Sequence, residues 1–424
     1  MTEEFLHYLW KFRLLERELL STSGEPVTVI CPGDHNHNGG PDFLNARIRL
    51  GDTTWAGNVE IHINAGDWFR HNHDTDKAYE NVILHVVYDD NDVAKRFEHN
   101  IPVLILKDKF PEYIHDRYED FLKNRLWIPC ESLIRKVDPV YFEQWSFALL
   151  TERLVNRSGQ WGKLLEANKF DWAETLHQSI ARGFGIRINT LPFELLAKAL
   201  PLKIVLKNMK SRLSLEALAF GQAGMLKRDF SDDYPKELKK EYDFLAGKYA
   251  LQPLDSSLWK FLRLRPCSFP TIRIAQWATL LEKADLLFSS VLESRTIDDI
   301  TELFMVQASE YWETHFVFDK LSPVMYKIMG TSTIHLHILN IVAPFLFFYG
   351  DYKGISEDKV RAIELIEKVP GERNSIITQW KQLGLPVNNA LHTQALIHLK
   401  TNYCDKKKCL DCRIGNKLLV NSEE

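Results

Sequence analysis

Two acidic residues and a histidine, separated by a predicted hairpin, are the side chains of this sequence best suited to chemistry. Asp42 follows Pro41, and Glu60-Ile61-His62 begins after 17 intervening residues. Alternate residues of a strand share a face, so Glu60 and His62 project together. Carboxylates can hold a divalent cation that activates water and neutralises a phosphate. We therefore expect Asp42 and Glu60 to bind a cation, with His62 as general base or third ligand.

The face on which Asp42 lies is harder to derive. Strict alternation along residues 45–49 would place Asp42 on the apolar face of its strand. We expect it instead at the mouth of the strand, where Gly40-Pro41 can turn it outward. The competing explanation is a solvated face with ordinary polar residues, because Pro-Asp and Glu-x-His are each common.

Histidines concentrate near this pattern, since seven of the 15 fall between residues 31 and 99. His71, His73 and Asp76 follow His62 closely, at a density sufficient to bind a metal. Three explanations remain open. The segment extends the site of Asp42 and Glu60, it forms an independent zinc site from His62, His71, His73 and Asp76, or it is a mobile polar loop.

Three other histidines carry weaker signals. His85 stands in a continuous apolar strand, where a core histidine with a satisfied hydrogen bond is expected. His35 and His37 lie in a loop rich in Gly, Pro and Asn and should face solvent.

The elements that must position these residues form an α/β pattern. Apolar spacing predicts a helix over residues 4–20 and a short helix near residues 75–80. Strands are expected at Val27–Ile30, Phe43–Leu50, Trp55–Ile63, Val82–Tyr88 and Pro102–Leu106. This order predicts a domain over residues 1–110 with a mixed sheet and helices against it.

The remainder of the chain has a different periodicity. Residues 111–400 contain many helical runs, among them residues 139–156, 272–288 and 333–349, and predict a large all-α domain. No fixed-period repeat is evident. The tail, residues 401–424, is too short for its own core and is expected to pack back on the protein, fixed by a metal.

The tail carries three cysteines at metal-binding spacing, Cys404-x4-Cys409-x2-Cys412. Cys130 is our preferred fourth ligand, with Cys267 and His398 as alternatives. Either zinc or an iron–sulfur cluster fits this spacing, and three unrelated cysteines are the competing explanation. Six cysteines in 424 residues are too few for a disulfide scaffold.

A basic and aromatic segment precedes the middle of the helical region. Arg263, Arg265 and Arg273 alternate with aromatic side chains and are candidates for nucleic-acid binding. Arginine and aromatic residues also make domain interfaces, which the sequence favours. The net charge of −4 provides no overall attraction to nucleic acid, so binding would depend on such a local surface.

Bulk composition describes a globular chain, 45% hydrophobic and 26% charged, long enough for two or three domains. The start of the sequence is acidic, without the basic region of a signal peptide. The longest apolar run, residues 338–349, is interrupted by Asn340 and Pro344. We expect a cytoplasmic protein with no membrane partner; the sequence leaves protein partners undefined.

The pattern Pro41-Asp42, 17 residues, Glu60-Ile61-His62, set in a helix and strands, resembles the PD-(D/E)xK restriction-endonuclease-like superfamily of metal-dependent nucleases. The resemblance implies that Asp42 and Glu60 bind Mg²⁺ or Mn²⁺. It also implies a third residue, usually lysine, that orients the water, and here the position is His62. Arg47 is a candidate replacement cation. The first helix of such folds often contributes an acid, for which Glu3 and Glu4 are available.

Longer stretches are similar to a family of uncharacterised bacterial proteins of about this length. They are Gly39–Phe43, Gly57–His62, Asp67–His73, Ile83–Val87, Arg263–Pro266, Phe269–Gln276 and the cysteine tail, so the similarity covers nearly the whole chain. It implies no known activity. One cysteine near a nuclease-like domain and three at the far end are also similar to iron–sulfur-bearing members of the nuclease superfamily.

These observations predict a restriction-endonuclease-like α/β domain with a mixed sheet, followed by a large all-α domain. The expected function is metal-dependent phosphodiester hydrolysis in DNA or RNA. The alternative is a catalytically inactive, nuclease-derived module that binds nucleic acid or a protein partner, because neutral histidine supplies less fixed charge than lysine. A third hypothesis is an unrelated zinc hydrolase that uses the histidine segment.

Overall fold

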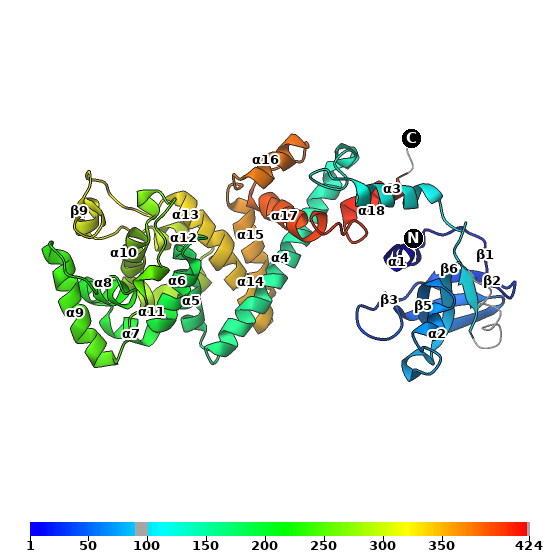
Figure 1. The fold of residues 1–424 in the computed structure, drawn as a ribbon, viewed down its shortest axis with the longest axis horizontal. Coiled ribbons are helices and arrows are strands. Elements are labelled where there is room, and N and C mark those ends of the chain that lie inside the picture. Colours follow the sequence, from blue (N-terminus) through cyan, green and yellow to red (C-terminus); the bar gives the residue numbers. More distant parts are fainter. Residues whose placement is uncertain (90–100, 422–424) are drawn as a thin grey trace. The chain divides into compact units, whose positions relative to one another are not determined.

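The computed structural model describes residues 1–89 and 101–421, so His99 lies outside the described residues (Figure 1). The chain divides into two compact units. Unit 1 comprises residues 1–145 together with the tail from residue 399, and unit 2 comprises residues 146–398. The α/β part therefore extends beyond residue 110 and includes the C-terminal segment.

Unit 1 is built on one mixed sheet with strand order β1-β2-β4-β5-β6-β7, and β3 pairs with β4. The pairs from β1 to β5 are antiparallel, whereas β5, β6 and β7 are parallel. The strands are β1 (Leu19–Leu20), β2 (Pro26–Cys31), β3 (Asp34–His35), β4 (Phe43–Leu50), β5 (Thr53–Asn64), β6 (Val82–Asp89) and β7 (Val103–Ile105). The predicted mixed sheet is thus confirmed.

The first helix is shorter than the apolar pattern predicts. Helix α1 (Glu3–Lys11) begins with Thr2, whose side chain caps it. Phe12 follows its last residue, and the next residue, Arg13, has a φ of 53°, which is outside the helical range and stops the helix. Leu19 and Leu20, predicted as the last helical turn, instead form β1. The single helix predicted over residues 4–20 is therefore a shorter helix followed by a short strand.

A β-bulge in β4 determines where Asp42 points. Phe43 lies opposite Val59 and Ala46 lies opposite Gly57, so two residues of β4 face one residue of β5. Asn45, inside the bulge, has a φ of 58°, a conformation that asparagine tolerates. The extra residue reverses the alternation, so Asp42 shares the face of Glu60. The bulge, rather than a turn at Gly40-Pro41, places the acid.

Short helices and the tail complete unit 1. Helices α2 (Asp67–Arg70) and η1 (Lys77–Tyr79) connect β5 to β6. Helix α3 (Glu112–Lys123) packs against α1, where the rings of Phe5 and Tyr118 stack at 5.4 Å. The tail forms a π-helix (Lys400–Cys404) and helix α18 (Arg413–Val420), which packs beside α3.

Unit 2 is largely helical and surrounds one continuous apolar core. Helix α4 (Pro139–Ala167) leads into it. The helices that follow are α5 (Trp172–Phe184), α6 (Thr190–Ala199), α7 (Leu202–Asn208), α8 (Arg212–Gln222), α9 (Asp233–Tyr249), α10 (Pro270–Leu280), α11 (Ala284–Glu293), α12 (Ile297–Phe304), α13 (Thr331–His337), α14 (Ala343–Lys353), α15 (Ser356–Lys368), α16 (Ser375–Gln382) and α17 (Ala390–Leu399).

One detail departs from the all-α prediction for this region. A small hairpin joins β8 (His315–Val317) to β9 (Lys320–Leu321), with Asp319 at a φ of 64° in its turn. In the described part of the chain, one helical segment, Thr331–Lys353, is long and apolar enough by composition to cross a membrane. Most of its apolar window is buried inside the protein.

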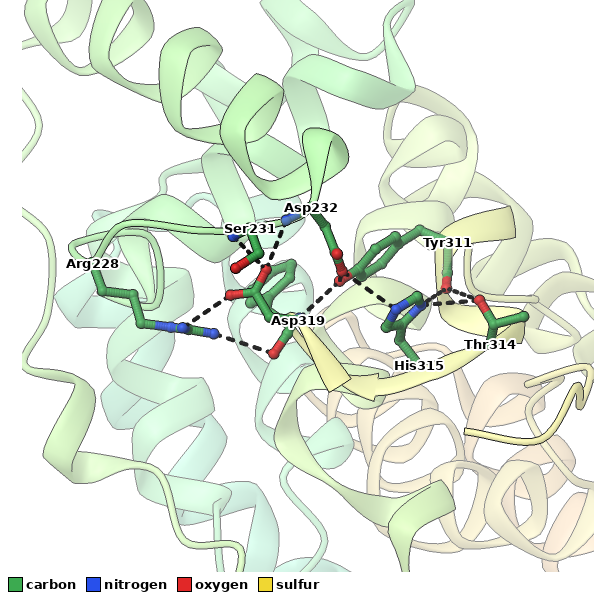
Figure 2. Close-up of polar contacts among 8 residues, drawn as sticks. Arg228, Ser231, Asp232, Tyr311, Thr314, His315 and Asp319 are labelled. Carbon is green, nitrogen blue, oxygen red and sulfur yellow. Dashed lines mark hydrogen bonds and ion pairs between the residues drawn. The ribbon is translucent and has the colours of Figure 1, made fainter. Parts of the chain in front are cut away.

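A polar network holds the hairpin of unit 2 in place (Figure 2). The carboxylate of Asp319 accepts the backbone amides of Ser231 and Asp232 at 2.9 and 3.0 Å and pairs with Arg228 at 3.0 Å. The Tyr311 hydroxyl donates to Asp232 at 2.6 Å and accepts the Asp319 amide at 3.0 Å. We call these residues, with Thr314 and His315, the Asp319 network.

Candidate metal centre

Asp42 and Glu60 hold one another through backbone amides. The amide of Asp42 donates to Oε2 of Glu60 at 3.0 Å, and the amide of Ile61 donates to Oδ2 of Asp42 at 2.9 Å. This reciprocal arrangement requires two adjacent strands at one register, which the bulge in β4 provides. The two acids therefore belong to a single site at the end of β4.

Three histidines gather beside Glu60. The ligand atoms of His62, His71 and His73 all lie within 4.8 Å of one another, close enough to hold one metal ion. Oε1 of Glu60 lies 3.5 Å from Nε2 of His62 and 3.3 Å from Nε2 of His73. The segment that follows β5 is therefore joined in space to the acids, and the carboxylate of Glu60 belongs to both groups.

Packing fixes the orientation of these imidazoles. The ring of His73 stacks on Tyr79 at 3.8 Å and meets the edge of Trp68 at 5.5 Å. Nδ1 of His62 is hydrogen-bonded to Nε2 of His85 at 2.9 Å, and His85 is fully buried on β6. His85 is thus a core histidine with a hydrogen bond, as expected. A ligating histidine is commonly oriented by such a partner at its other nitrogen.

Charge in this site is kept low. Burial, followed by the charge of Asp42, raises the pKa of Glu60 to about 8. Burial also lowers the pKa of His62 to about 4 and that of His85 to about 3. For Asp42, burial acts to raise the pKa, but His7 and the Ile61 amide outweigh it and the pKa is lowered. The pair thus carries about one negative charge at neutral pH, beside neutral imidazoles.

The donor set fits a divalent transition-metal ion. Neutral imidazole nitrogens and carboxylate oxygens are the ligands that zinc and manganese take in proteins. A bound cation would also lower the pKa of Glu60, because the cation favours the ionised carboxylate. Such a centre can polarise a phosphoryl or carbonyl oxygen and supply a metal-bound hydroxide.

Two predicted site residues are not among the three histidines whose ligand atoms meet. The Asp76 carboxylate accepts the amide of Ala78 at 2.9 Å and caps η1, and its charge acts to raise the pKa of His73 against the effect of burial. Arg47 lies opposite Ala56, four residues before Glu60 on β5. At ~3.3 Å per residue this is about 13 Å along the strand. The structure does not bring Arg47 to the acids.

Helix α1 contributes a histidine that the sequence did not single out. Nε2 of His7 lies 3.2 Å from Oδ2 of Asp42. The predicted acids of this helix take a lesser part: the charge of Glu3 adds to the raised pKa of Glu60. His7 precedes Asp42 by 35 residues in a helix that reads as ordinary amphipathic sequence. Its proximity depends on how α1 packs on β5.

The four predicted cysteine ligands all belong to unit 1. Cys130 follows α3, Cys404 ends the π-helix, and Cys412 immediately precedes α18. Cys130, Cys409 and Cys412 are buried, and no disulfide joins the cysteines of the chain. The alternatives for the fourth ligand lie in unit 2, where His398 pairs with Glu152 and Cys267 contacts Met325.

The thiols influence one another. Burial, then the charges of Cys412 and Cys409, raise the pKa of Cys130. Burial also raises the pKa of Cys404, with Cys412, Cys130 and Cys409 adding to it. Gly415 permits this fold of the tail, since a Cβ there would lie 2.2 Å from the carbonyl oxygen of Cys409. The thiols therefore lie close enough to act on one another's pKa, with Cys404 half-buried and the other three buried.

The arginines proposed to bind nucleic acid separate into two groups. Arg263 and Arg265 are exposed, and Arg263 has a φ of 64°. Arg273 is buried in α10 and donates to Gln276 at 2.9 Å. Arg273 therefore belongs to the core of unit 2, which corrects its assignment to a nucleic-acid surface.

Comparison with known proteins identifies the family of this chain. Residues 3–375 match the family described as protein of unknown function (DUF2851), and the chain belongs to that family. No curated protein and no solved structure matches it.

Proposed function

We propose that this DUF2851 protein is a divalent-metal-dependent phosphodiesterase that acts on DNA or RNA. The observation that carries the proposal is the single site formed by Asp42 and Glu60, each bound to the other's strand and joined to His62 and His73. The sequence resemblance to metal-dependent nucleases supports the choice of substrate class.

The residues of the chain divide the work as follows. Asp42, Glu60 and the imidazoles of His62, His71 and His73 would hold the cation. When bound, a divalent cation supplies a water of lowered pKa and neutralises charge on the phosphate. His62 is kept neutral by burial and oriented by His85. In the tautomer whose Nδ1 donates to His85, its Nε2 lone pair points toward Glu60.

The ligand types also set a metal preference. Mg²⁺ favours oxygen ligands and retains its waters, whereas a mixed nitrogen and oxygen site binds first-row transition metals, with affinity rising from Mn²⁺ toward the later metals. Because histidines outnumber acids here, we expect Mn²⁺ to support hydrolysis better than Mg²⁺.

The test is hydrolysis by the metal-free full chain after addition of Mg²⁺, Mn²⁺ or Zn²⁺. Labelled single-stranded and double-stranded DNA and RNA are the substrates. Asp42→Asn and Glu60→Gln keep the size of each side chain and should lower the rate at least 100-fold. Glu25→Gln removes an exposed charge in the turn before β2 and should retain the rate. Equal rates in all four proteins would overturn the assignment.

A second function is supported by one observation: the position usually held by lysine is a buried, neutral histidine. A nuclease-derived module that binds nucleic acid without cutting it would show this change. Gel-shift binding that is retained in Asp42→Asn, together with no cleavage under any metal, would favour this alternative.

We also propose that Cys130, Cys404, Cys409 and Cys412 hold a thiophilic metal centre, either zinc or an iron–sulfur cluster. Such a centre would fasten the tail to the segment after α3. The tail is otherwise attached by contacts such as Arg117 with the carbonyls of Leu418 and Asn421, at 2.7 and 2.6 Å. A metal reverses the effect of burial on the thiols, because it favours the thiolates.

Anaerobic purification followed by metal analysis and visible absorption separates the two. Iron with sulfide and a broad visible band indicates a cluster, and zinc with no colour indicates a mononuclear site. Cys130→Ser should lose the metal in either case. Cys267→Ser, which alters an exposed cysteine of unit 2, should retain it. Protein purified without stoichiometric metal would overturn this proposal.

A further inference from the structure

A second pair of histidines lies on the Asp42 side of the carboxylate pair. His7 of α1 contacts the Asp42 carboxylate, and the ring centres of His7 and His35 are 5.2 Å apart. These residues are separate from the group around Glu60. The sequence did not single out His7, and His35 was expected to face solvent.

Both histidines stand on fixed elements. The indole of Trp10, one turn after His7, donates to the carbonyl of Pro32 at 2.9 Å and joins α1 to the segment before β3. His35 belongs to β3, and its ring stacks on Phe43 at 4.9 Å and 13°. The side chains are therefore oriented by packing.

The loop between His35 and Asp42 is also held. The backbone amide of Asn36 donates to the carbonyl of Asp42 at 2.7 Å. The side-chain amide of Asn36 donates to the carbonyl of Pro41 at 3.0 Å. Its side-chain oxygen accepts the amide of Asn38 at 2.9 Å. A loop closed by one asparagine in this way keeps His35 close to Asp42.

The ring spacing matches that of the recognised histidine group. His62, His71 and His73 have ring centres 5.2, 5.3 and 5.5 Å apart. Two imidazoles bound to one ion with metal–nitrogen bonds of 2.0–2.1 Å have ring centres about 5 Å apart. His7 and His35 have this ring spacing too, which packed rings in general also show, and Nε2 of His7 lies 3.2 Å from the carboxylate of Asp42.

We propose that His7, His35 and Asp42 hold a second divalent cation, adjacent to the one held by Glu60, His62, His71 and His73, with Asp42 shared between the two ions. The inference rests on the proposed function in one respect, that Asp42 and Glu60 form one site. A site with two ions about 3.5–4 Å apart clamps both the attacking and the leaving oxygen of a phosphodiester. The expected substrate class is therefore a phosphodiester rather than a carboxylic ester.

Metal stoichiometry tests the inference directly. The full chain is loaded with Mn²⁺ by equilibrium dialysis, and bound manganese is counted by mass spectrometry. We expect two ions at the histidine–carboxylate site of the wild-type protein and one in the double variant His7→Ala/His35→Ala. His37→Ala, an exposed neighbour of His35, is the matched control and should keep both ions. Because any cysteine-bound metal is counted as iron or zinc, it does not enter this total.

Electron paramagnetic resonance provides a second readout that does not depend on catalysis. Two adjacent Mn²⁺ ions give an exchange-coupled spectrum, and the double variant should give the six-line spectrum of an isolated ion. Circular dichroism melting of the metal-free proteins checks that the variants fold. Wild-type protein that binds one ion, or a double variant that binds two, overturns the inference.

The two proposals fail in different ways. Two coupled ions without hydrolysis of any substrate would remove the proposed activity and leave the second metal position intact. Hydrolysis by a protein that binds one ion would support the proposed activity and remove the second metal position.

Discussion

The site around Asp42 and Glu60 lies on two central strands of a sheet, and the Asp319 network lies at a small hairpin. Both gather acids and histidines, but the hydrogen-bond partners of their carboxylates differ. Asp319 accepts two backbone amides and an arginine, and the amide of Asp232 is the largest cause that lowers its pKa. Glu60 accepts one amide and faces imidazoles kept neutral, and its pKa is raised to about 8. One carboxylate is ionised by the protein itself, and the other lacks the positive charge that would ionise it.

This difference separates a structural network from a candidate metal centre. Buried polar groups in a stable protein normally find complementary donors and acceptors. The Asp319 network follows that rule with fixed backbone donors, which are available without any ligand. The site in unit 1 instead gathers carboxylate oxygens and imidazole nitrogens with lone pairs, and a cation would complement these groups.

The comparison predicts first that divalent metal stabilises unit 1 and leaves unit 2 unchanged. A ligand at 100 times its dissociation constant stabilises the folded state by ~2.7 kcal/mol. Calorimetry with Mn²⁺ or with chelator should therefore shift one unfolding transition upward. Glu60→Gln should abolish the shift, whereas Glu25→Gln should preserve it. A shift that survives Glu60→Gln would place the stabilising ion elsewhere.

Tyr311→Phe should weaken the Asp319 network and destabilise unit 2. It removes a hydroxyl that donates to Asp232 and accepts the amide of Asp319. Because both partners are half-buried and water can reach them, losing these hydrogen bonds should cost about 0.5–1.5 kcal/mol. We expect chemical denaturation to show that loss in unit 2, with metal binding unaffected. An unchanged free energy of unfolding would mean that water replaces the hydroxyl.

Glu216 of α8 supplies a pH-dependent test within unit 2. Burial raises its pKa, although hydrogen bonds from Tyr234 and Ser309 oppose that shift. The folded state then binds more protons than the unfolded state above the ordinary pKa of about 4.3, so stability falls as pH rises through the folded pKa. Glu216→Gln cannot ionise and should remove this decline.

The measurement is the free energy of unfolding between pH 4 and pH 8. The gain from Glu216→Gln should be smallest at pH 4 and largest at pH 8. Glu237→Gln alters an exposed residue of α9 and should show no such trend. A gain that is equal at every pH would assign the effect to packing instead of ionisation.

The sequence was sufficient for the strands on either side of β5, which carries Glu60. The alternation of Phe43–Leu50 and the continuous apolar run at Val82 predicted β4 and β6 nearly to the residue, because period two is a local property. The helical run at residues 272–288 was read as one helix and is divided into α10 and α11 by a 3₁₀ turn (Leu281–Lys283).

The composition of the site could be predicted only in part. Glu60 and His62 share a strand, so their common face follows from alternation. The approach of His7 to Asp42 depends on helix packing and on a bulge at Asn45, and neither leaves a periodic signal. Asp76 was predicted as a metal ligand because it is near His73 in sequence, but its carboxylate also accepts the hydrogen bond that caps η1. Local hydrogen bonding then decided its position.

Asp76 provides the smallest expected effect and the sharpest check on that correction. Asp76→Asn keeps a side-chain oxygen for the Ala78 amide and removes the negative charge, whereas Asp76→Ala removes both. If the residue serves only as a cap, Asp76→Ala should cost ~0.5–1 kcal/mol and Asp76→Asn almost nothing. Both variants should bind as much manganese as the wild type, measured by equilibrium dialysis. A loss of metal affinity in Asp76→Asn with stability retained would return Asp76 to the ligand set, because only a ligand needs the charge.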